Sequence, residues 1–178
     1  EKQKIVQQIW ECVKESILFL LKNGRATRLM FWNAFIGAIA TLYLFFLQAQ
    51  LPLKGLPMGL LGPSLFVVGL GGAVGAKLVQ CFSEWKYSRI SILCVSGVIL
   101  GAMTILMKNP WIMCIGGFAS AMFDDLIQVR SDVLLNSMIP SEQRATLVSV
   151  SSFCFSIIMI SVFICSFHIA FSRRLCHI

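Results

Sequence analysis

The sequence predicts an all-α protein, a polytopic membrane helix bundle of about five transmembrane helices with an N-terminal amphipathic cytoplasmic helix. Two observations predict this class. Of the 178 residues, 57% are hydrophobic and only 13% are charged, whereas roughly 25% charge is typical of a soluble domain. The hydrophobic residues also form long runs, and a run of ~18 or more residues crosses the hydrocarbon core of a bilayer, which is about 30 Å thick.

The chain divides into three parts by composition. Residues 1–25 place apolar side chains such as Ile9 and Val13 at helical spacing among lysines and glutamates, which predicts an amphipathic helix on the membrane surface or under the bundle. The transmembrane bundle occupies residues 26–172, and residues 173–178 form an atypical tail. Because the chain begins with glutamate and shows no signal-peptide pattern, we expect it to be a fragment of a longer protein.

Five apolar runs inside the bundle are each long enough to span a bilayer. They are Leu29–Leu47, Leu56–Val79, Ile90–Met107, Trp111–Val129 and Ala145–Phe171. Glycine, proline and charged residues separate the runs, as is typical of connections. Lysine and arginine are concentrated before the first run and in the second and fourth connections. The positive-inside rule places these segments in the cytoplasm, so we expect a multi-pass membrane protein whose N-terminal segment is cytoplasmic.

Small residues recur four positions apart within the runs. Examples are Gly71 with Gly75 and Gly97 with Gly101. In lipid, apolar burial supplies no drive for association, and small residues at this spacing let helix backbones approach closely. Two interpretations remain open: the glycines serve static helix packing, or they mark a helix that slides or rocks on its neighbour.

A group of polar residues lies near the cytoplasmic end of the fourth run, in the stretch MFDDLIQVRSD. At ~1.5 Å per residue, Asp124 and Asp125 lie roughly 20 Å into the membrane. A carboxylate at that depth must face a polar cavity, pair with a cation or bind a proton. Asp125, Gln128 and Asp132 share one helical face. Either the acids, Gln128 and Asn33 of the first run face a transport path, or the charges form a solvated or ion-paired cap of the helix end.

Other functional classes find little support. The seven cysteines lack C-x-x-C spacing and the two histidines add no ligand pattern, so we expect neither a metal site nor a cofactor. The chain offers no G-x-S-x-G nucleophile turn, and adjacent aspartates on a helix point about 100° apart, so we do not expect an enzyme. Topology explains the net charge of +7, and nucleic acid is not an expected partner because no basic patch is interleaved with aromatic residues.

Two segments resemble a known family. LLNSMIPSEQRATLVSVSS, which follows an aspartate-bearing span, resembles the cytoplasmic connection between the tenth and eleventh helices of major facilitator superfamily transporters, particularly bacterial drug-efflux-like members. GAKLVQCFSEWKYSR resembles the C-terminal copy of the family's loop motif, G-x-x-x-D-R-x-G-R-K/R, with Gly75 and Arg89 as matching residues. The aspartate and the G-R pair of that motif are missing here. The likeness extends over nearly the whole chain, which would correspond to helices seven to eleven.

This resemblance implies a twelve-helix secondary transporter whose two six-helix halves rock about a central site. The chain would lie in a bacterial cell membrane and would need the missing N-terminal half as its partner. It would move a small molecule by efflux coupled to protons, with Asp124 or Asp125 as the proton or cation site. The resemblance also implies a set of charged residues at the cytoplasmic gate, namely Arg130, Asp132, Arg144, Glu84 and Arg89. The alternative is a truncated membrane protein that does not transport and only packs with partner helices.

Overall fold

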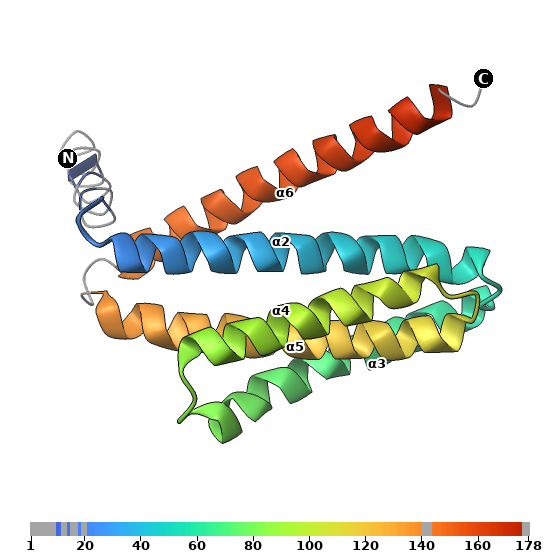
Figure 1. Cartoon of the computed structure of the whole chain (residues 1–178), viewed down its shortest axis with the longest axis horizontal. Coiled ribbons are helices and arrows are strands. Elements are labelled where there is room, and N and C mark those ends of the chain that lie inside the picture. Colours follow the sequence, from blue (N-terminus) through green and yellow to red (C-terminus); the bar gives the residue numbers. More distant parts are fainter. Residues whose placement is uncertain (1–9, 12–13, 15–17, 19–20, 140–143, 176–178) are drawn as a thin grey trace, which may run out of the picture. The chain divides into compact units, whose positions relative to one another are not determined.

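The computed structural model describes residues 10–11, 14, 18, 21–139 and 144–175, and its elements there are helices (Figure 1). Most of the predicted amphipathic helix falls outside these residues, as do residues 140–143 of the fourth connection and residues 176–178 of the tail. The first helix described in full, α2 (Gly24–Leu53), is instead an apolar candidate for a membrane span.

Four further long helices follow α2, and two of them continue into short 3₁₀ turns. They are α3 (Met58–Leu78) with η1 (Val79–Phe82), α4 (Tyr87–Met103) with η2 (Thr104–Leu106), α5 (Pro110–Met138) and α6 (Arg144–Leu175). Five helices within the described residues are long and apolar enough to cross a membrane. The prediction of an all-α chain with five helices that could span a membrane is therefore confirmed for the described residues. The helices α2 and α5 are longer than the predicted runs because helical hydrogen bonding continues into their polar ends, which an apolar run does not include.

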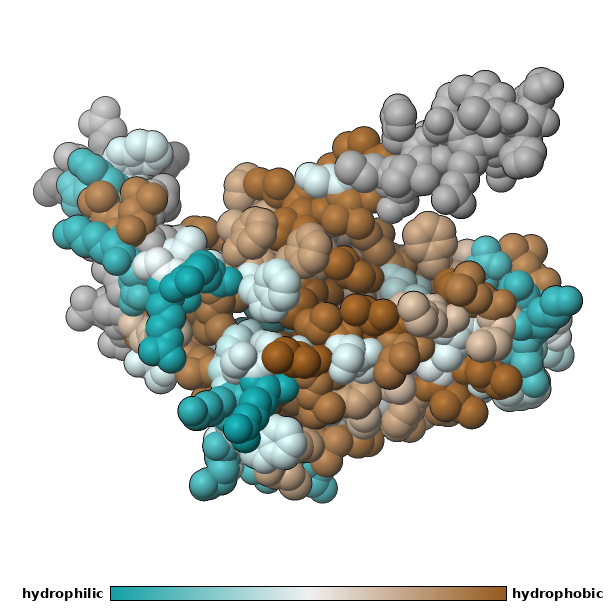
Figure 2. Space-filling view, viewed as in Figure 1, coloured by the Kyte–Doolittle hydropathy of each residue, from teal (hydrophilic) through white to brown (hydrophobic). Residues whose placement is uncertain are grey.

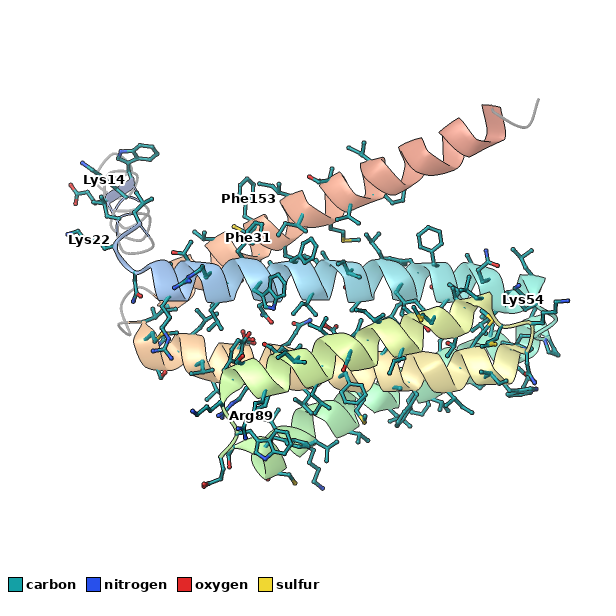
Figure 3. The ribbon with its side chains drawn as sticks, viewed as in Figure 1. Lys14, Lys22, Phe31, Lys54, Arg89 and Phe153 are labelled. Atoms are coloured by element: carbon teal, nitrogen blue, oxygen red, sulfur yellow. The ribbon has the colours of Figure 1, made fainter. Side chains whose placement is uncertain are left out.

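A glycine turn ends α2 and reverses the chain toward α3. Gly55 has a positive φ of 94°, a conformation that favours glycine. Its N–H donates to the Pro52 carbonyl at 3.1 Å, and the Leu56 N–H donates to the Leu51 carbonyl at 3.1 Å. This pair of bonds is a Schellman motif, and its two leucines are buried in one apolar cluster. The predicted connection between the first two spans is thus a tight turn, next to which Lys54 lies (Figure 3).

The start of α5 is fixed by the two residues that the sequence marks as a connection. Pro110 occupies the first helical position, where a missing N–H costs nothing because that donor has no partner within the helix. The side-chain oxygen of Asn109 accepts a hydrogen bond of 2.9 Å from the Trp111 N–H, which satisfies one of the free donors of the first turn.

The chain forms two compact units. The first, the Ile36–Arg130 unit, contains α3, α4, most of α2 and most of α5, and the second, the terminal unit, contains residues 1–35 and 131–178. The core of the terminal unit contains side chains from the first turns of α2 and α6 and from the last turns of α5. Its buried side chains are Ala26, Met30, Leu135, Ile139 and Leu147.

The Ile36–Arg130 unit has two apolar clusters, one toward each end of its helices. One cluster consists of Tyr43, Leu47, Leu51, Leu56, Val68, Met113 and Ala121. The other consists of Ile36, Val79, Ile90, Cys94, Leu126 and Ile127. On the face drawn in Figure 2, hydrophobic residues cover the middle of the helices and hydrophilic residues gather toward their ends, the distribution that a membrane-spanning helix requires.

Candidate functional site

The α3 and α5 helices of the Ile36–Arg130 unit touch along their backbones. A methyl group at Gly71 would overlap the carbonyl oxygen of Phe118, and one at Gly75 would overlap that of Met122. Only glycine leaves room for such an approach. The predicted close packing through small residues is therefore confirmed for this pair.

Glycines also bring α4 against α5. A Cβ at Gly101 would lie 2.6 Å from the carbonyl oxygen of Gly116 and 3.0 Å from Cβ of Ser120. One turn earlier in α4, Gly97 makes room for the aromatic ring of Phe123. On its remaining side, α5 contacts α2, where Gly117 lies against the Leu47 side chain. The α5 helix is thus in contact with α2, α3 and α4 within the unit.

The two predicted acids occupy different surroundings on α5. Asp125 is partly buried, and its carboxylate fills the space that Gly72 of α3 leaves free. Asp124 is only 7% exposed. Gln128 donates from Nε2 to Oδ2 of Asp124 at 3.3 Å, so the amide pairs with Asp124 rather than with the predicted stripe of Asp125 and Asp132. The four-residue separation explains this, because side chains at i and i+4 lie one above the other on a helix.

The surroundings of Asp124 provide few interactions that would offset the cost of burying an ionised carboxylate. Its neighbours include the Cys94 thiol of α4, with which it interacts electrostatically, and Cys94 belongs to the apolar cluster around Leu126 and Ile127. The second oxygen, Oδ1, has no hydrogen-bond partner among the described residues. An ionised carboxylate without a cation is strongly disfavoured in such a setting. The group is therefore suited to bind a proton or a cation.

Three hydroxyl groups that the sequence did not single out as site residues gather around Gly101 in the same unit as Asp124. Tyr43 of α2 and Thr104 of η2 both donate to the Gly101 carbonyl, at 3.1 Å and 2.7 Å. Ser120 lies next to Gly101, is 1% exposed, and its Oγ has no partner among the described residues. The sequence signal for Ser120 is its position one turn before Asp124; Tyr43 and Thr104 carry no comparable signal.

The remaining predicted transport-path residue lies in the terminal unit. Asn33 of α2 is 9% exposed, and its Oδ1 has no hydrogen-bond partner within the described residues. Asp132 of α5 lies in the same unit and is exposed. Ser152 and Ser156 of α6 are also exposed, and they donate to carbonyls of their own helix at 3.1 Å and 3.0 Å. Their hydroxyl protons are thus used locally.

Two of the five predicted gate residues, Arg130 and Arg144, bond backbone carbonyls. Arg130 donates from Nη2 to the carbonyls of Ser83 and Trp85, at 2.7 Å and 3.3 Å, and so ties α5 to the connection between η1 and α4. Glu84, in that connection, and Arg89, in the first turn of α4, are exposed (Figure 3).

The α6 helix begins with a similar contact in the terminal unit. Arg144 donates from Nη2 to the Asn136 carbonyl in the last turn of α5, at 3.0 Å. Carbonyls at a helix C-terminus lack partners within the helix, and a guanidinium is a suitable donor to them. Arg130 and Arg144 thus have one role in common, which is to join an exposed backbone segment to a neighbouring helix.

The fold and this site define the class of protein: a multi-pass α-helical membrane protein with a buried carboxylate in one of its central helices. Within the described residues, no group of three or more histidine, cysteine, aspartate or glutamate side chains is placed to hold a metal ion. No protein-family model, no curated protein and no solved structure matches the chain.

Proposed function

We propose that this chain is part of a secondary active transporter that moves a small molecule across a bacterial cell membrane in exchange for protons, by alternating access. The burial of Asp124 carries the proposal. Asp124 is 7% exposed in a candidate span, and its hydrogen-bond partner is a neutral amide. The ionised carboxylate therefore carries a desolvation cost, which protonation removes. Binding and release of that proton is the step that couples such a site to a proton gradient.

The resemblance to the second half of major facilitator superfamily transporters supports the same proposal. The lysine and arginine distribution places the end of α5 that carries Arg130 in the cytoplasm, and Asp124 would lie in the cytoplasmic half of the membrane. In this arrangement, the contact of Arg130 with the connection before α4 holds the cytoplasmic ends of the helices together. Because this contact lies within one half, it would keep that half rigid while the two halves rock against each other.

The test uses the full-length protein in lipid vesicles with a pH-sensitive dye inside and an imposed pH gradient. Ethidium, a small lipophilic cation, serves as the transported probe. We expect ethidium to move against protons in the wild type and coupled movement to be lost in Asp124→Asn. The control is Glu11→Gln, because Glu11 is an exposed acid outside the proposed transport path and gate. Coupled flux at the wild-type rate in Asp124→Asn would contradict the proposal.

The alternative is a membrane protein that does not transport and packs with partner helices. One observation favours it: only 6% of the Leu147–Ile164 segment of α6 is buried, against 44% of the corresponding segment of α5. A helix with so little contact in its own chain presents its apolar side chains to lipid or to other helices. Absence of ethidium flux and of proton movement in both wild type and Asp124→Asn would favour this alternative.

A further inference from the structure

A row of hydroxyl groups follows the contact between α4 and α5. We define the hydroxyl row as the side chains of Tyr43, Thr104 and Ser120. Tyr43 and Thr104 meet at the Gly101 carbonyl, and Gly101 itself lies against Ser120. Ser120 is one helical turn before Asp124 on α5. All these groups belong to the Ile36–Arg130 unit, so the row leads to the buried carboxylate within one compact body.

The hydrogen bonds of the row leave oxygen atoms available as acceptors. The Tyr43 and Thr104 hydroxyls each donate a hydrogen bond to the Gly101 carbonyl. The lone pairs on both hydroxyl oxygens remain available as acceptors. Oγ of Ser120 and Oδ1 of Asp124 are buried and have no partner among the described residues. Buried oxygens without hydrogen bonds are costly, and proteins commonly satisfy such groups with ordered water. The row therefore has the chemistry of a chain of water-bridged hydroxyls.

The row extends in one direction from Asp124. Ser120 and then Thr104, which lies against Gly116, lead toward the end of α5 that begins at Pro110. Gln128 is on the opposite side of Asp124, one turn closer to Arg130. The acid thus lies between an amide on one side and hydroxyls on the other.

We propose that the hydroxyl row, with water between its members, conducts protons between Asp124 and the Pro110 end of α5. Each water or hydroxyl oxygen of the row accepts a proton and releases another to the next oxygen, and the last proton binds Oδ1 of Asp124. For Tyr43 and Thr104, this requires the hydroxyl hydrogen to rotate from the Gly101 carbonyl to the next oxygen and to return afterwards. No electron is transferred, and every hydroxyl is regenerated. The proposal rests on the proposed function only in taking Asp124 as the proton site.

The charged and titratable surroundings of Asp124 agree with a proton as the ligand. On its own helix Asp125 is the adjacent acid, and Cys94 of α4 interacts with Asp124 electrostatically. From α3, glycines contact α5 and Val68 shares an apolar cluster with it; from α2, Leu47 contacts Gly117. None of these described groups is a cation, so no fixed positive charge among them takes the place of the proton.

The test measures proton access to Asp124 directly, without any transported substrate. Infrared spectroscopy of the full-length protein in lipid vesicles at acidic pH identifies the C=O stretch of protonated Asp124 as the band missing in Asp124→Asn. On transfer to D₂O this band shifts as the carboxyl group is deuterated. We expect Ser120→Ala and Thr104→Val to slow deuteration by about tenfold, since each removes one hydrogen-bonded step.

Two matched variants separate conduction from structure. Thr104→Ser keeps the hydroxyl and should deuterate at the wild-type rate. Ser96→Ala removes a hydroxyl of α4 that is exposed and donates to the Leu93 carbonyl at 2.8 Å, and it should also leave the rate unchanged. Wild-type deuteration rates in both Ser120→Ala and Thr104→Val would overturn the proposal, as would the absence of an Asp124 carboxyl band from the wild-type spectrum.

The two proposals can fail independently. If ethidium does not exchange for protons, but deuteration of Asp124 still slows in Ser120→Ala, the transport function is wrong and the proton path stands. If coupled flux requires Asp124 but the deuteration rate of Asp124 is unchanged in Ser120→Ala and Thr104→Val, Asp124 receives its proton by another route.

Discussion

The two sides of α5 that face α3 and α4 are built differently. On the α3 side, Gly71 and Gly75 lie directly on backbone carbonyls, and the carboxylate of Asp125 fills the place of a missing side chain at Gly72. On the α4 side, glycines again shorten the distance, but hydroxyl groups gather around Gly101, and the oxygen of Ser120 has no partner among the described residues.

This difference shows that close glycine packing and a polar site can share one helix. In lipid, the α3 side supplies the attraction that holds α5 in place, because tight contact gains dispersion energy that lipid chains do not offer. The α4 side can then tolerate buried oxygens without complete hydrogen bonding. Three substitutions test this division of roles, and the expected effects fall from the first to the third.

The largest effect is expected for Gly75→Ala. Its new methyl group would overlap the Met122 carbonyl oxygen, and backbone cannot move aside as a flexible side chain can. We expect the free energy of unfolding to fall by about 3 kcal/mol, as for overpacked cores. The measurement is thermal unfolding in detergent micelles, followed by circular dichroism.

The control for this prediction is Gly69→Ala, also in α3. Nothing lies within 4 Å of the Cβ position at Gly69, so alanine should raise stability by up to about 1 kcal/mol through its higher helix propensity. Equal unfolding temperatures for the two variants would show that the α3 contact does not depend on backbone approach.

Part of this arrangement could be predicted from the sequence. The five spans follow from apolar runs, since only long apolar helices satisfy a bilayer, and the spacing of Gly71 and Gly75 predicts close packing. The sequence does not specify which helix these glycines contact, because a small residue can pack against the backbone of any neighbouring helix. The predicted face of Asp125, Gln128 and Asp132 does not specify a hydrogen-bond partner either, and the Gln128 amide bonds Asp124.

The polar groups were harder to predict for a related reason. The sequence pattern around a serine in an apolar run does not show whether its hydroxyl bonds its own helix. Ser152 and Ser156 make such a bond, whereas Ser120 has no partner among the described residues. The neighbouring helix decides between the two. At Ser120, the Gly116 carbonyl one turn earlier lies against Gly101 of α4.

A smaller effect is expected at the connection that sets the relative position of α3 and α4. Arg130→Ala removes two hydrogen bonds, to the carbonyls of Ser83 and Trp85. We expect a loss of about 1–2 kcal/mol in unfolding free energy, the magnitude for hydrogen bonds from a charged donor at a partly exposed site. Arg89→Ala is the control, since Arg89 is exposed and surface substitutions change stability by roughly 0.5 kcal/mol or less. If both variants unfold alike, the arginine does not fix the connection.

The smallest effect on stability is expected for Ser120→Ala, and its sign is informative. Removing a hydroxyl that donates and accepts no hydrogen bond relieves a desolvation cost, so the unfolding free energy should stay within about 0.5 kcal/mol of the wild type or rise. The same unfolding experiment measures it. A loss above about 1 kcal/mol would mean that Oγ bonds a protein group on which the α4–α5 contact depends. In that case slow deuteration of Asp124 in this variant would reflect a loosened α4–α5 contact, and Thr104→Val, compared with Thr104→Ser, would have to establish the proton path alone.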